Sequence, residues 1–147
     1  MLLKLSLLAL FGIAMAHFEG VVVVYLRKAL GMLDTDGNKE SAEKIPKRFL
    51  YIEMTREAAT IIMLAVIAFL AGTTWPERGI FFLWTFAFWD LFYYLSLYIL
   101  IKWPPSLKSI DVLFLIPVPW IAPVWFPVAV SSLTILVIAA LYIFKVF

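Results

Sequence analysis

The chain alternates between long apolar runs and short polar connections. Four runs are long enough to cross a membrane as helices, because about 20 apolar residues span a ~30 Å hydrocarbon core. Charged residues, glycines and prolines bound these runs, which cover residues 5–26, 49–71, 79–101 and 124–144. We therefore predict an all-α integral membrane protein in which four transmembrane helices form an antiparallel bundle and residues 1–147 make a single membrane domain.

The beginning of the first run imitates a signal peptide. A lysine at position 4 precedes an apolar stretch, and Ala14 and Ala16 flank one residue as in a small-residue cleavage site. The apolar character continues past that point through Val24 to a basic stop at Arg27. An uncleaved membrane span is therefore the better prediction.

Two connections are more than simple turns. Residues 27–48 form the most polar stretch and predict a solvated loop, since they lack the spacing of an EF-hand calcium loop. Residues 103–123 carry repeated prolines, which a regular helix does not accommodate. Non-helical backbone at membrane depth needs protein or water around it. We predict that residues 103–123 form a Pro-rich interfacial or re-entrant segment before the last helix.

Composition strengthens the membrane assignment and removes other classes. Hydrophobic residues make up 65% of the chain and the mean hydropathy is +1.01, whereas a soluble domain is about half apolar. The absence of cysteine excludes disulfides and thiolate metal sites. Basic residues gather beside the apolar runs and do not interleave with aromatic residues on a polar surface. We therefore expect a lipid bilayer as partner and no nucleic acid.

The distribution of basic residues predicts an orientation. Eight lysines and arginines fall in or beside the loops at 27–48 and 102–111, against three at the opposite side of the spans. Because cytoplasmic loops carry the excess of positive charge, we place these two loops in the cytoplasm and both termini outside. The expected location is the cytoplasmic (inner) membrane.

Six ionisable side chains fall inside the predicted spans: His17, Glu19, Glu53, Arg56, Glu57 and Asp90. A charged side chain at the centre of a membrane helix costs about 2.5–3.5 kcal/mol on insertion scales, and such residues usually face a bundle interior. Their number therefore indicates a functional site.

The depths and helical phases of these residues agree. At 1.5 Å per residue, Glu19 and Glu57 lie roughly 12–14 Å from the cytoplasmic flank and Asp90 about 18 Å from it. One helical stripe carries Glu53, Arg56, Glu57 and Thr60, and another carries Asp90, Tyr93 and Tyr94. Three spans thus bring polar groups to the same layer.

Negative charge exceeds positive charge in this layer. Four carboxylates face one guanidinium and one imidazole, so the remaining negative charge must be neutralised by protons, a metal cation or a basic group of a partner. We predict a cation or proton site made of Glu57, Asp90, Glu19 and His17. Arg56 and Glu53 form the internal counter-charge pair, and the supporting residues are Tyr94, Tyr93 and Thr60.

Several functions remain open at this point. The first is proton or cation translocation, which with four spans implies a homo-oligomer or a larger membrane complex. The second is metal-dependent activity in the membrane, with a divalent ion held by His17, Glu19, Glu57 and Asp90, as in an enzyme acting on a lipid or a quinone. The third is a non-catalytic accessory subunit of a larger complex. No catalytic residue is predicted.

Overall fold

The computed structural model describes residues 1–31 and 45–146. Within these ranges the chain is mostly helical, with helices α1 (Leu2–Ala29), α3 (Lys47–Ala71), α4 (Trp75–Ile101) and α5 (Trp125–Ile143). All four are long and apolar enough to cross a membrane, as the sequence predicts. The remaining regular structure is a hairpin of strands β1 (Ile110–Phe114) and β2 (Trp120–Pro123). Most of the predicted polar loop, residues 32–44, lies outside the described residues.

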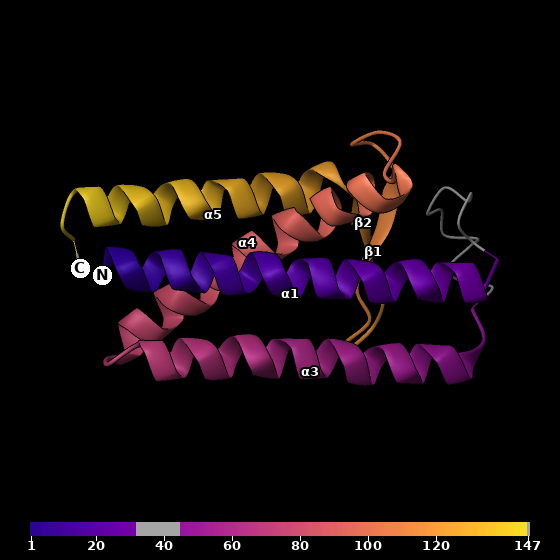
Figure 1. The fold of residues 1–147 in the computed structure, drawn as a ribbon, viewed down its shortest axis with the longest axis horizontal. Coiled ribbons are helices and arrows are strands. Elements are labelled where there is room, and N and C mark those ends of the chain that lie inside the picture. The colour runs from indigo at the N-terminus through magenta and orange to yellow at the C-terminus, as the bar shows by residue number, and fades with distance from the viewer. Residues whose placement is uncertain (32–44, 147) are drawn as a thin grey trace.

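Successive helices run in opposite directions, and both termini lie at the same end of the molecule (Figure 1). Helix α4 crosses the others obliquely, from beside α3 at the end with the termini to beside α5 at the other end. The β-hairpin lies at this second end, which also holds the end of α1 and the beginning of α3. We call it the hairpin end.

Local sequence explains where α4 begins and ends. The Thr74 side chain accepts a hydrogen bond from the Glu77 backbone N–H, and the Glu77 carboxylate accepts one from the backbone N–H of Thr74. This capping box satisfies backbone donors that the first turn leaves unpaired. Pro76 in the first turn costs no hydrogen bond there. At the other end Lys102 adopts a left-handed conformation (φ 57°) that ends the helix.

Glycines allow α1 to approach α4 closely. A Cβ atom added to Gly12 would lie 2.7 Å from the backbone carbonyl oxygen of Thr85, and one added to Gly20 would lie 3.0 Å from the Cβ atom of Ser96. Small residues such as Gly20, next to Glu19, let two helix backbones approach closely. The tighter contact at Gly12 is not evident from the sequence.

Buried apolar side chains run along the α1–α4 contact, and the outer faces stay exposed. Phe81 and Leu97 of α4 and Leu64 of α3 are fully buried. By contrast, only 11% of the most apolar window of α5 and 17% of that of α3 are buried inside the protein. Two of the helices thus present long apolar surfaces outward.

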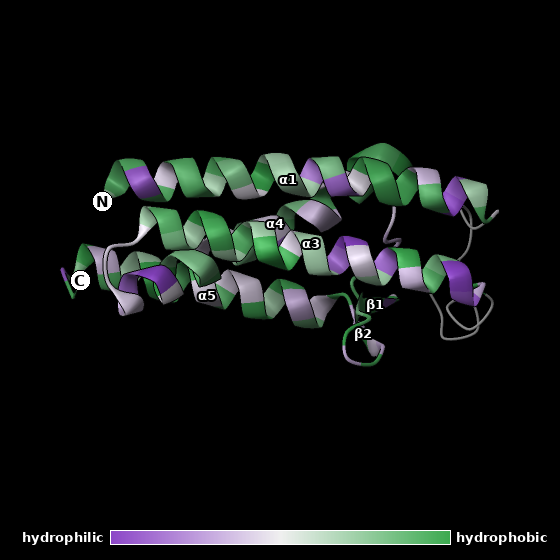
Figure 2. Ribbon diagram, turned by 90° about the horizontal axis from the view of Figure 1, so that it is seen from below, coloured by the Kyte–Doolittle hydropathy of each residue, from purple (hydrophilic) through white to green (hydrophobic). Residues whose placement is uncertain are grey.

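The Pro-rich segment folds into an antiparallel β-hairpin, which the sequence does not predict. Val112 pairs with Ile121, and the register shifts between Val112 and Phe114. The prolines at 117 and 119 fall in the connection between the strands, where no ladder hydrogen bond is required of them. Figures 1 and 2 show the hairpin reaching across the helices toward α3. Whether this segment is interfacial or re-entrant stays a prediction.

Substitution of Gly12 by alanine should destabilise the fold. The new methyl group would meet backbone atoms of α4, which cannot rotate away, and overpacking of this kind costs about 1–3 kcal/mol. Thermal unfolding of the purified protein in detergent, followed by near-ultraviolet circular dichroism, measures the loss. Gly79→Ala is the matched control, because nothing lies within 4 Å of its added Cβ atom and alanine favours helix by about 1 kcal/mol. Equal melting of Gly12→Ala and wild type would refute the close-packing argument.

Candidate functional site

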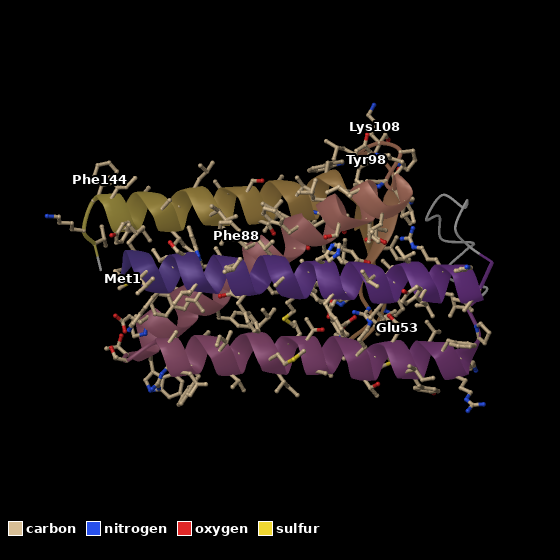
Figure 3. The ribbon with its side chains drawn as sticks, viewed as in Figure 1. Met1, Glu53, Phe88, Tyr98, Lys108 and Phe144 are labelled. Carbon is tan, nitrogen blue, oxygen red and sulfur yellow. The ribbon has the colours of Figure 1, made fainter. Side chains whose placement is uncertain are left out.

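The polar groups of the helices concentrate toward the hairpin end. In Figure 2 the hydrophilic stretches of α1 and α3 lie in the half that holds the hairpin, apart from the helix termini. Figure 3 shows nitrogen and oxygen atoms between α1 and α3 around Glu53. Side chains from every described helix and from β1 contribute polar contacts in this half.

Glu19 is the single carboxylate of α1, and it is buried, with 4% of its surface exposed. It accepts hydrogen bonds from the Thr60 hydroxyl of α3 and from the Trp89 indole N–H of α4, the latter over 3.2 Å. One residue therefore ties three helices together. Partners of this kind are required, because a buried carboxylate without hydrogen bonds is very costly.

Arg56 supplies the positive charge for this carboxylate. Its guanidinium lies 3.1 Å from Glu19 Oε2 and donates over 2.6 and 3.0 Å to Glu53 Oε2, one turn earlier on α3. Glu53 and Arg56 are three residues apart, so their side chains meet on one helix face. Two carboxylates thus share one guanidinium.

Glu57 makes a different kind of contact. Its two carboxylate oxygens accept hydrogen bonds from the backbone N–H groups of Leu115 and Ile116, over 2.8 and 3.1 Å. These amides follow β1 directly, where the hairpin turns. Glu57 therefore holds the tip of the hairpin against α3.

Asp90 faces the last helix. The hydroxyl of Ser131, which is 4% exposed, donates a 2.7 Å hydrogen bond to Asp90 Oδ2. No salt bridge joins Asp90 to a lysine, arginine or histidine among the described residues. Its partner is a neutral hydroxyl.

Asp111, on β1, continues the polar layer into the hairpin. The Tyr94 hydroxyl donates a 2.8 Å hydrogen bond to Asp111 Oδ2, and the charge of Arg27 acts on the same carboxylate. Arg27 also stacks 4.2 Å above the Trp103 ring. Burial raises the pKa of Asp111, against the lowering effects of the Tyr94 hydrogen bond and of Arg27. Tyr94 thus holds the base of the hairpin as Glu57 holds its tip.

His17 lies apart from these groups. Its side chain is largely exposed, and its Nδ1 atom is 3.3 Å from the Ser96 hydroxyl of α4. Glu19, two residues later, points inward to α3. This separation follows from helix geometry, since residues two apart lie about 200° from each other around the axis.

The structure gives the four residues of the predicted cation site separate partners. Glu19 meets Arg56 and Thr60, whereas Glu57, Asp90 and His17 each have their own partners. Among the described residues, no group of three or more His, Asp or Glu side chains is close enough to hold a metal ion. The described residues therefore give no support to the four-residue metal site expected from the sequence, which stays a prediction. Equal depth along the helices does not imply proximity, because these side chains face different neighbours.

Several residues of the polar layer escaped the sequence analysis. Asp111 was assigned only to the Pro-rich segment, and Arg27 was counted as a flanking charge that sets orientation. The sequence does not show that Ser131 and Trp89 belong to this layer. Each lies in an apolar helix, and its hydrogen-bond partner comes from another helix. A signal did exist for Asp111, since it is the lone acidic residue of an apolar stretch that resumes after the prolines at 104 and 105.

Comparisons with protein-family models, curated proteins and solved structures find no match for this chain.

Replacement of Arg56 by methionine should destabilise the protein strongly. Glu19 would remain buried without its counter-charge, and breaking a buried ion pair from one side costs about 3–5 kcal/mol. Unfolding in detergent measures the loss. The exposed Arg48→Met on the same helix is the control and should change stability by less than about 0.5 kcal/mol. Adding Glu19→Gln to Arg56→Met should recover part of the loss, and no recovery would contradict the pairing.

Proposed function

We propose that this chain is an integral membrane protein that binds protons on buried carboxylates and passes them through the layer at the hairpin end. Its function would be proton translocation or proton-coupled transport, and the site residues would be Asp90, Glu57, Glu19 and Asp111. The proposal keeps three of the four residues of the predicted cation site, replaces His17 by Asp111, and takes the proton as the cation. Dispersed carboxylates can each bind a proton, whereas a metal ion needs several donors at one point.

The charge balance of the layer supports proton binding. Five carboxylates and two guanidiniums lie in it, which leaves three negative charges: Glu19, Glu53, Glu57, Asp90 and Asp111 against Arg27 and Arg56. A low-dielectric interior does not hold such an excess of charge. Buried carboxyl groups relieve it by taking up protons. His17 adds no compensating charge to the interior, because it is exposed.

The position of Asp90 on α4 and its hydrogen-bond partner are the observation that carries the proposal. Asp90 lies midway along α4, fifteen residues from the first residue of that helix and eleven from the last. It has a hydroxyl and not a cation as its hydrogen-bond partner. Ionisable residues at such positions in membrane helices characteristically serve ion pathways and proton relays.

The arrangement suggests an order for the relay. Asp90 and Tyr94 are one turn apart on α4, and the Tyr94 hydroxyl donates to Asp111. Asp111 lies on the hairpin that Glu57 holds at its tip. The proposed path therefore runs from the middle of α4 toward the hairpin end.

Basic residues favour the hairpin end as the cytoplasmic side, with both termini outside in the inner membrane. The contact of Leu115 and Ile116 with Glu57 supports a partly re-entrant hairpin, because Glu57 lies ten residues, or about 15 Å, into α3. The outward apolar faces of α3 and α5 suit either lipid or further copies of the chain. A homo-oligomer or a larger membrane complex thus remains part of the proposal.

Proton flux into proteoliposomes tests the proposal. Asp90→Asn should lower the flux at least tenfold, because the amide keeps the shape and can still accept the Ser131 hydrogen bond but cannot bind a proton at neutral pH. A pH-sensitive dye inside the vesicles, with a potassium gradient and valinomycin to set the potential, reports the rate.

The control is Thr134→Val on α5, whose hydroxyl bonds only within its own helix. It should conduct like wild type. Wild-type vesicles that leak protons no faster than empty ones, or Asp90→Asn vesicles that conduct normally, would refute proton translocation through Asp90.

A further inference from the structure

The Tyr93 ring lies beside one residue of each of the two polar groups that the helices and the hairpin form. Its ring centroid is 6.4 Å from that of Trp89, which donates to Glu19, and 5.4 Å from that of Tyr94, which donates to Asp111. It packs against both apolar clusters that surround these residues. Tyr93 is therefore next to both polar groups, the one around Glu19 and the one around Asp111.

The two polar groups beside Tyr93 hold charged side chains from three other elements. They are Glu19 and Arg27 of α1, Arg56 of α3 and Asp111 of β1. Among the described residues, the Tyr93 hydroxyl itself makes no hydrogen bond, although almost every other polar group in the layer does. The hydroxyl therefore keeps a free donor and a free acceptor function toward these four charged groups.

We propose that Tyr93 is the relay residue that connects the Glu19–Arg56 pair with Asp111, and so joins the polar contacts of α1 and α3 to those of the hairpin. This inference rests on the proposed proton translocation. The phenol oxygen receives a proton from a water molecule or a carboxylic acid on one side. Its own proton leaves to a carboxylate or a water molecule on the other side. The tyrosine is neutral before and after the step, so no charge is left in the interior.

Tyr93→Phe tests this role, because it removes the hydroxyl and keeps the packed ring. In the proteoliposome assay its proton flux should fall at least tenfold, while its unfolding temperature should stay close to that of wild type. Tyr98→Phe is the matched control, because Tyr98 is a half-exposed tyrosine of the same helix. It lies under Lys102, away from the four charged groups around Tyr93. Its flux should equal that of wild type.

Site-specific 3-fluorotyrosine at position 93 gives a second measurement that does not depend on removing a group. The fluorinated phenol keeps its shape and its hydroxyl but is more acidic, so the pH profile of flux should shift. A residue that only packs would leave the profile unchanged.

The possible outcomes distinguish the role of Tyr93 from proton translocation itself. Wild-type flux with normal flux in Tyr93→Phe, or an unchanged profile with fluorotyrosine, would overturn the role of Tyr93 and leave proton translocation standing. No wild-type flux would overturn both.

Discussion

The buried carboxylate of Glu19 constrains the rest of the structure, because its contacts join three helices. Thr60 and Arg56 reach it from α3, and Trp89 reaches it from α4. Each partner satisfies part of a charge that would otherwise be too costly to bury. Few other contacts link α1 directly to α3, so this polar junction is the main direct link between these two helices, while α3 also packs against α4. The close approach of α1 and α4 at Gly12 and Gly20 in turn brings Trp89 within reach.

The hairpin completes the layer that the helices begin. It is held at its base by the Tyr94–Asp111 hydrogen bond and at its tip by Glu57, and both anchors are carboxylates. An acidic group that accepts two backbone N–H bonds does so best when ionised, because protonation turns one acceptor into a donor. Protonation of Glu57 would therefore weaken its contacts with the hairpin. Under the proposed function, this would connect proton binding with a change of structure.

Much of the fold follows from the sequence, because long apolar runs bounded by charges leave few alternatives to membrane helices. The helical class and the four apolar helices were predicted for that reason. The stripe of Glu53, Arg56 and Thr60 could also be read, since it depends only on the helical repeat. The hydrogen bond between Asp90 and Ser131 and the contact of Glu57 with the hairpin could not be predicted from the sequence. Both depend on how the helices cross. The β-hairpin was missed because prolines argue against helix without specifying what replaces it.

The central claim is that uncompensated carboxyl groups in this layer carry protons at neutral pH. Infrared spectroscopy of the purified wild-type protein at pH 7 tests it most directly, through the carbonyl stretching band of protonated carboxylic acids. The account predicts that this band is present, that it shifts on exchange into heavy water, and that it loses intensity in Asp90→Asn. A spectrum at pH 7 with no such band would show that every carboxyl group is ionised and would contradict the account.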